Sequence, residues 1–260
     1  MLRALYSSAT GMKAQEYLID VTSNNLANVN TNGFKRSQMD FADLMYSTIR
    51  APGAEIANGQ TSPIGFQIGS GVRPVGTTKN FSTGTIEPTG NPTDMAIEGQ
   101  GFFEVTMPDG SFRYTRDGAF RVDANGMLVT GDGYPLSPQI TIQDGAIDIN
   151  VSPGGIVDGM LNGTRTTFGT ITLNRFTNPA GLSSEGNNLF AVTAASGPAQ
   201  TGQPQQNGYG AILGKFLEKS NVEVVTELIS LITAQRAYEI NSRAIRAGDE
   251  MLSTTTDIVR

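Results

Sequence analysis

The sequence predicts an α+β protein in which two long amphipathic helices, one at each end, form a coiled-coil-like domain around an inserted antiparallel all-β domain. Three observations support this fold class. Apolar residues recur at helical spacing in both terminal segments, the middle segment alternates with a period of two, and all 12 prolines and most of the 31 glycines lie in that middle segment. The expected divisions are residues 1–35 plus 220–260 (helical), 36–74 (short helix and extended arm), 75–193 (β domain) and 194–219 (return arm).

The N-terminal helix is predicted over residues 2 to about 28. Its apolar positions lie three, four or seven residues apart, which keeps them on one helical face. These positions are Leu2, Leu5, Ala9, Met12, Ile19 and Leu26. The run of Asn and Gly in residues 28–33 ends the helix, because both residues tolerate the left-handed conformation. Polar residues interrupt the apolar run that a signal peptide needs, so we expect the segment to be mature structure.

The next segment is predicted to hold a short helix and then an arm. Ser37 and Asp40 resemble a helix start. Apolar residues follow at roughly helical spacing, namely Phe41, Leu44, Met45 and Ile49. From residue 51 to residue 74 neither period is sustained, which indicates an extended arm or loop.

The middle of the chain reads as antiparallel β structure. Short aromatic or β-branched runs at residues 101–106, 112–115, 119–122 and 127–130 are separated by Asp-Gly or Asn-Gly pairs, and similar runs continue to residue 193. Such pairs between strand-like runs predict hairpins. Ser, Gly, Gln and Pro then dominate to residue 210, which predicts a surface loop or second arm.

The C-terminal helix is predicted to start at a capping box formed by Ser220 and Glu223. It carries two apolar stripes roughly 130° apart on the helix surface. The first stripe is Val224, Leu231, Tyr238, Ile245, Leu252 and Val259. The second stripe is Ala237, Ile240, Ala244, Ala247, Met251 and Ile258. One partner helix within the molecule cannot cover both stripes, so the pattern favours assembly with other subunits over a private two-helix hairpin.

Composition excludes several classes of function. The net charge of −6 argues against a nucleic-acid binder, which needs a basic face. Cysteine and histidine are both absent, which removes the thiol nucleophile, the usual general base and the commonest metal ligands. No apolar run is long enough to predict a membrane span.

Three short motifs suggest binding or catalysis but have simpler interpretations. Residues 123–126 start like a calcium loop but lack its distal Glu, and Asn-Gly predicts a hairpin turn there. Residues 99–101 start like a dinucleotide fingerprint, but Glu104 occupies the third glycine position and no helix is predicted to follow. Asp94, Glu98 and Glu104 read as strand or loop residues and not as a glycosidase pair. We therefore predict no catalytic residue, cofactor or metal site.

Motifs at both ends and in the middle resemble those of bacterial flagellar rod and hook proteins. The N-terminal motif comprises Ser23, Asn24, Asn25, Leu26, Ala27 and Asn28, followed by Gly33, Phe34 and Lys35. The C-terminal motif spans residues 227–241, and the central one spans residues 96–103 and 114–120. The resemblance covers the whole chain.

Within that family, the length and residues 41–54 resemble the distal rod type. The stretch includes Tyr46, Ile49, Pro52 and Gly53. Hook proteins carry an additional outer domain and lack this stretch. We hypothesise that residues 46–70 wedge between neighbouring subunits and prevent the sliding that a hook needs.

The resemblance implies a structural subunit of a hollow helical rod that spans the periplasm in the basal body. It implies contacts with copies of itself, with proximal rod and hook proteins, and with the peptidoglycan and outer-membrane ring proteins. It also implies passage through the flagellar type III export apparatus without a cleaved signal. The alternatives are a proximal rod or short hook-type subunit of the same family and, from other classes, a secreted β-rich hydrolase or a coiled-coil adhesin.

Overall fold

The structure, a computed structural model, describes residues 2–53, 55–57, 60–61 and 63–258. The chain forms two compact units. The helical unit contains residues 1–26, 37–78 and 223–260, and the β unit contains residues 27–36 and 79–222. The β unit is therefore inserted into the helical unit in sequence, and we describe each unit by itself.

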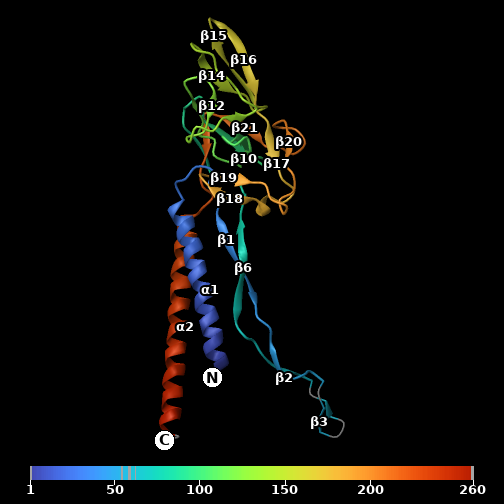
Figure 1. Cartoon of the computed structure of the whole chain (residues 1–260), viewed down its shortest axis with the longest axis vertical. Coiled ribbons are helices and arrows are strands. Elements are labelled where there is room, and N and C mark those ends of the chain that lie inside the picture. Colours follow the sequence, from blue (N-terminus) through green and yellow to red (C-terminus); the bar gives the residue numbers. More distant parts are fainter. Residues whose placement is uncertain (1, 54, 58–59, 62, 259–260) are drawn as a thin grey trace. The chain divides into compact units, whose positions relative to one another are not determined.

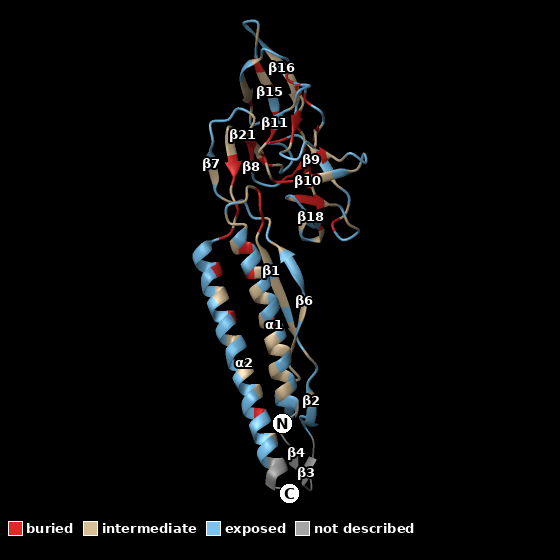
Figure 2. Cartoon of the chain, turned by 60° about the vertical axis from the view of Figure 1, so that its left-hand side comes forward, coloured by how far each residue is buried: buried red, intermediate tan, exposed pale blue. Residues whose placement is uncertain are grey.

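Two long helices, α1 (Leu2–Ala27) and α2 (Val224–Ile258), dominate the helical unit and confirm the predicted terminal helices. With 26 and 35 residues they are about 39 Å and about 52 Å long. They lie side by side in Figure 1 and Figure 2, with Gly11 against Asn241 and Gly248 against Leu5. Because an early residue of α1 meets a late residue of α2, the pair is antiparallel. Its coiled-coil character stays a prediction.

The predicted start of the C-terminal helix was wrong by a few residues. Ser220 does not cap α2; its Oγ accepts a hydrogen bond from the Val222 amide at 3.3 Å. The first helical turn is closed instead by the carbonyl of Glu223, which accepts from the Glu227 amide at 3.0 Å. The reason is tertiary, since the chain is still bound into the β unit at Lys219, whose amide donates to the Thr85 carbonyl at 2.8 Å.

The short helix predicted after residue 37 was also wrong, because this region forms strands. The helical unit contains β1 (Ser37–Asp43), β2 (Ser47–Arg50), β3 (Glu55–Ala57), β4 (Gln60–Thr61), β5 (Phe66–Ile68) and β6 (Val72–Lys79). β1 pairs with β6, β2 with β5 and β3 with β4, so the predicted arm is a series of two-stranded ladders and not an unpaired loop. Strand partners that lie outside the local segment, β5 for β2 and β6 for β1, override the local helical spacing.

The β unit confirms the predicted antiparallel strands. They are β7 (Ile86–Pro88), β8 (Met95–Glu98), β9 (Phe103–Thr106), β10 (Phe112–Thr115), β11 (Arg121–Val122), β12 (Leu128–Val129), β13 (Leu136–Ser137), β14 (Ile147–Val151), β15 (Ile156–Leu161), β16 (Thr164–Thr170), β17 (Leu173–Arg175), β18 (Ser183–Gly186), β19 (Leu189–Ala191), β20 (Gln200–Gly202), β21 (Ala211–Gly214) and β22 (Phe216–Glu218). A short 3₁₀ helix covers Pro179–Gly181.

The largest sheet of the β unit has the strand order β13-β9-β10-β19-β18, and a second sheet has the order β14-β15-β16. Met95, Ile97, Phe103, Val105 and Ile212 are fully buried and lie in one apolar core. This core gives the β unit the buried red strands of Figure 2.

The predicted return arm is largely part of this β structure. β20 pairs with β17, β21 with β8 and β22 with β7, so the segment that we expected to run free supplies three strands. Its Ser, Gly, Gln and Pro content reflects the turns between them, such as Gln203 to Gly210, where Gln205 and Asn207 have positive φ.

Candidate assembly site

Outside its buried seam with α1, α2 carries a set of exposed apolar side chains. Its large members are each 41–65% exposed: Val225, Leu228, Ile229, Ile232, Ile240 and Met251. We call this set the outer face of α2; most of α2 is pale blue in Figure 2. Of the second predicted stripe, Ile240, Ala244, Ala247 and Met251 are exposed and Ala237 is half-buried. Exposed apolar area of this kind marks an interaction surface.

Sequence reasoning missed the first turns of this face. Val225, Ile229 and Ile232 lie at i, i+4 and i+7, which is the spacing of a third apolar set. The two sets chosen from the sequence began at Val224 and at Ala237, so the intervening turns were not counted.

The seam between α1 and α2 is built mainly from small or polar residues. On α2, the buried seam residues are Glu227, Ala234 and Gly248. The first predicted stripe only flanks them, because Leu231, Ile245 and Leu252 are half-buried and Val224 and Tyr238 are exposed. On α1 the buried residues are Ala14, Thr22 and Asn25; Leu5, Met12, Ile19 and Leu26 are half-buried and Ala9 is exposed. The side chains of Leu2, Ile258 and Val259 lie outside the described residues. Small residues let the helix backbones approach closely, which helical spacing of large residues does not reveal.

Asn25 explains much of the N-terminal motif. Its Nδ2 donates to the Ser37 carbonyl at 2.8 Å and to Glu227 Oε2 at 3.2 Å, and its Oδ1 accepts from the Ser37 amide at 2.9 Å. Asn25 is 1% exposed and Glu227 is 2% exposed. One buried amide therefore ties the end of α1 to the start of β1 and to the first turn of α2. Ser23, Asn24 and Ala27 lie on the exposed side of α1, and Asn28 is half-buried.

Gly33 and Phe34 are both buried in the β unit. Gly33 has a φ of 68°, its amide donates to the Glu218 carbonyl at 2.8 Å, and a Cβ there would lie 2.5 Å from the Asp117 amide nitrogen. Only glycine fits such a position. The Lys79 ammonium lies 5.2 Å from the centroid of the Phe34 ring, a cation–π contact.

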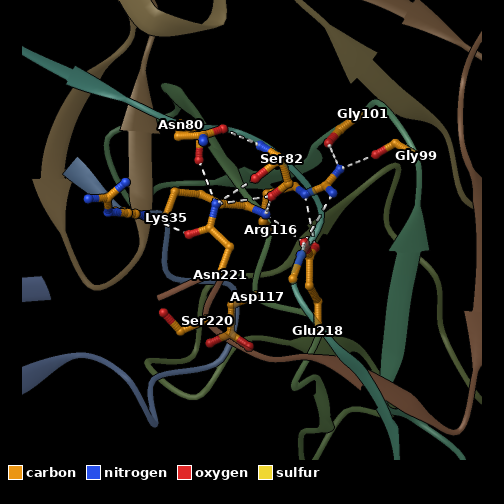
Figure 3. Close-up of polar contacts among 12 residues, drawn as sticks. Lys35, Asn80, Ser82, Gly99, Gly101, Arg116, Asp117, Glu218, Ser220 and Asn221 are labelled. Atoms are coloured by element: carbon orange, nitrogen blue, oxygen red, sulfur yellow. Dashed lines mark hydrogen bonds and ion pairs between the residues drawn. The ribbon is translucent and has the colours of Figure 1, made fainter. Parts of the chain in front are cut away.

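Lys35 belongs to a buried charge cluster in the β unit (Figure 3). Its Nζ lies 2.6 Å from Glu218 Oε1, and both side chains are 0% exposed. Arg116 Nε lies 3.0 Å from Glu218 Oε2, an ion pair that lacks hydrogen-bond alignment. Arg116 Nη1 donates to the carbonyls of Gly99 and Gly101 at 2.8 Å and 2.7 Å. We call Lys35, Arg116 and Glu218 the charge cluster; it places two cations around one carboxylate.

The pKa of Lys35 is lowered from 10.5 to about 8, chiefly by burial and then by the Arg116 charge, against the opposing effect of Glu218. Between about pH 8 and 10.5 the unfolded chain therefore binds more protons at this residue than the folded chain does. Stability contributed by Lys35 accordingly rises with pH across that interval.

We expect the β unit to gain stability from pH 8 to 10.5 relative to Lys35→Met, which removes this titration and keeps most of the volume. Amide hydrogen exchange of β8 in both proteins, corrected for the intrinsic pH dependence of exchange, measures the difference. Parallel pH profiles for the two proteins would contradict the expectation.

The arm that contains β2 to β5 carries further exposed apolar side chains. In the predicted rod-type stretch, Tyr46 and Ile49 are each 55% exposed, and Pro52 and Gly53 are exposed at a turn where Gly53 has a φ of 78°. Met45, Ile64 and Phe66 are also exposed. None of the three was predicted as an assembly residue; Met45 was predicted only as part of the short helix.

The acidic and glycine motifs serve the fold. Asp123 accepts hydrogen bonds from the amides of Asn125 and Met127 in its own hairpin turn, and Asp94 Oδ2 accepts from Thr89 Oγ1 at 2.6 Å. Glu104 accepts from Ser137 at 2.8 Å and from Asn174 at 3.1 Å, and Glu98 is exposed. Within the described residues no three acidic side chains gather as metal ligands do. Among the described helices, none has the length and apolar content to cross a membrane.

Three family models match successive parts of the chain. A flagella basal body rod protein model matches residues 5–35, a flagellar hook protein FlgE/F/G D1 domain model matches residues 96–159, and a flagellar basal body rod FlgEFG protein C-terminal model matches residues 213–258. The first and last cover most of α1 and α2, and the middle one covers part of the β unit. These matches define a protein of the flagellar rod and hook class.

Full-length relatives narrow this class. The chain is 45% identical over 260 residues to the flagellar basal-body rod protein FlgG of Buchnera aphidicola subsp. Schizaphis graminum, covering 99% of this chain and 100% of the relative. It is 42% identical over 264 residues to that of Borreliella burgdorferi, with both chains fully covered, and 43% identical to that of Caulobacter vibrioides, with 99% of both covered.

The chain belongs to the FlgG family of flagellar basal-body rod proteins. It is a structural subunit of the flagellar distal rod, located in the basal body, where it assembles with other rod and hook components. The resemblance predicted from the motifs is thereby confirmed.

Proposed function

We propose that the subunit polymerises with copies of itself into a rigid, hollow helical tube that transmits motor torque to the hook and conducts export substrates. The single observation that carries this proposal is the outer face of α2, whose large apolar side chains are 41–65% exposed in the isolated chain. A helix with one side against α1 and large apolar side chains in solvent is suited to a wall of packed helices. The proposed role is mechanical and involves no catalysis.

A tube follows from the geometry of repeated contacts. Because the outer face of α2 and the exposed arm are different surfaces, a contact between them joins unlike patches on neighbouring subunits. Unlike contacts that do not close a ring produce an open helical filament. Electron microscopy of the purified, polymerised chain tests this directly: we expect a hollow tube, and a closed trimer would instead favour an adhesin.

We further propose that the ends of the tube contact proximal rod and hook proteins and that its outside turns within the peptidoglycan and outer-membrane rings. Family membership supports these partners, together with passage through the type III export apparatus without a cleaved signal and a location across the periplasm. The absence of cysteine is compatible with export of an unfolded chain, since no disulfide cross-links it.

Residues 46–70 are proposed to wedge between neighbouring subunits and to prevent sliding. The exposed apolar side chains of Tyr46, Ile49 and Phe66 support this role, because they offer the arm an apolar contact surface. Deleting the arm is expected to leave a polymer that bends more easily, with its persistence length reduced several-fold in electron micrographs. Equally straight and rigid filaments after the deletion would refute the wedge.

The terminal helices are expected to be largely disordered in the dilute monomer. Small and polar seam residues such as Ala14, Ala234 and Gly248 bury little apolar area, while the outer face of α2 stays exposed. Circular dichroism should therefore show helix content rising several-fold on polymerisation. Full helix in the dilute monomer would contradict this expectation.

A further inference from the structure

Two side chains join the segments through which the chain enters and leaves the β unit. Residues 33–36 form the inbound segment and residues 218–221 form the outbound segment. Lys35 Nζ of the inbound segment lies 2.6 Å from Glu218 Oε1 of the outbound one. Three residues along, Asn221 Oδ1 accepts a hydrogen bond from the Arg36 amide at 2.8 Å. The two contacts join residues 183 and 185 positions apart in sequence, so the two segments are cross-linked at two successive points.

A third segment is held by the same side chains. Asn221 Nδ2 donates to the Asn80 carbonyl at 2.9 Å and to Ser82 Oγ at 3.0 Å, and Lys35 Nζ donates to the Ser82 carbonyl at 2.6 Å. The Asn80 amide in turn donates to the Arg36 carbonyl at 2.9 Å. In Figure 3 the side chain of Lys35 from the inbound segment and that of Asn221 from the outbound segment both point toward Asn80 and Ser82.

The tied segments lead directly to the two terminal helices. Residues 28–32 connect α1 to the inbound segment, and only Val222 and Glu223 separate Asn221 from α2. Neither Lys35 nor Asn221 belongs to the apolar core of the β unit, which is centred on residues such as Met95 and Phe103. Their contacts therefore hold the segments through which the chain enters and leaves the β unit, and they are not part of the packing of the apolar core.

We infer that Lys35 and Asn221 are positioning residues for assembly: they form a clamp that holds the connectors of α1 and α2 side by side. Bringing two distant chain ends together costs conformational entropy. Folding of the β unit already pays this entropy cost, because it brings the two connectors together. Pairing of α1 and α2 during polymerisation then costs less conformational entropy, which is the effect of preorganisation on association. This inference rests on the proposed polymerisation for its consequence, while the clamp itself exists in the single chain.

The test variant is Lys35→Met/Asn221→Ala in the full chain. Lys35→Met leaves Glu218 paired with Arg116, and Asn221→Ala leaves amides and carbonyls that water can reach, so the β unit is expected to stay folded. Asn178→Ala is the control, because Asn178 lies in the same unit and its Nδ2 donates to the Ala195 carbonyl, far in sequence from the clamped segments.

Because the chain contains no cysteine, a single pair of spin labels can be placed at Gln38→Cys and Glu223→Cys, both at exposed positions just beyond the clamp and outside the two terminal helices. In the dilute monomer we expect the label–label distance distribution to be narrow in the otherwise unchanged chain and in Asn178→Ala. It should be at least twice as broad in the double variant. An unchanged width in the double variant would overturn the clamp.

Asn221→Ala alone is measured in parallel and should show a smaller broadening of the distance distribution. If hydrogen exchange shows that the double variant has unfolded, the single variant replaces it, and an unchanged width in the single variant would overturn the clamp. In seeded polymerisation without labels, we expect the double variant to raise the critical concentration about ten-fold. An unchanged critical concentration would refute the role in assembly. Failure of the unaltered protein to polymerise would instead count against the proposed tube, and the distance measurement would still decide the clamp.

Discussion

Glu218→Gln is expected to destabilise the β unit by about 3–5 kcal/mol, the cost typical of breaking a buried ion pair on one side. Glutamine keeps the size of the side chain and one oxygen that can accept the Gly84 amide, which now donates to Glu218 Oε1 at 2.9 Å. The change therefore removes charge and little else. Lys35 and Arg116 would then face each other as buried cations without the carboxylate between them.

Lys35→Met is the matched control for this prediction. It removes one of two cations, so Arg116 and Glu218 remain a neutral pair, and we expect a loss no larger than about 1–2 kcal/mol. Hydrogen exchange of the β8 amides, which lie in the core of the β unit, reports both losses. Equal losses in the two variants would show that the sign of the remaining charge does not matter and would contradict the electrostatic explanation.

Ile240→Asp is expected to abolish polymerisation, with a critical concentration raised at least a hundred-fold. Ile240 is 65% exposed on the outer face of α2, so the single chain tolerates a carboxylate there. In a packed wall of helices the same carboxylate would be buried without a partner, which costs several kcal/mol. Sedimentation of polymer from monomer measures the critical concentration, and hydrogen exchange checks that the β unit stays folded.

Two further variants on α2 locate the effect. Gln235→Asp also places a charge at an exposed position of the helix, but roughly 140° round the helix from Ile240, and we expect polymerisation within a few-fold of normal. Ile245→Asp lies half-buried at the seam with α1 and is expected to stop polymerisation by separating the helices, again with the β unit folded. If Ile240→Asp polymerised like Gln235→Asp, the outer face would not be the subunit contact.

Local sequence patterns predicted the elements whose signal lies within a few residues. The terminal helices follow from apolar spacing over many turns, and hairpins such as β11–β12 follow from Asn125 and Gly126 between strand-like runs. The family motifs also contain residues that have specific structural roles. Asn25, Gly33 and Lys35 each prove to have a distinct structural task, although their spacing alone does not reveal it.

Only the tertiary structure decided the features that depend on distant partners. Residues 41–49 have helical spacing but form strands, because β5 and β6 offer backbone partners that a local pattern cannot contain. The start of α2 and two strands of the predicted return arm, β21 and β22, follow from pairing with segments more than a hundred residues earlier, as between β22 and β7. Periodicity in the sequence therefore determined the two helices and the β character of the middle. Which face each helix buries, and how Lys35 meets Glu218, required the fold, since these contacts join residues that no local period relates.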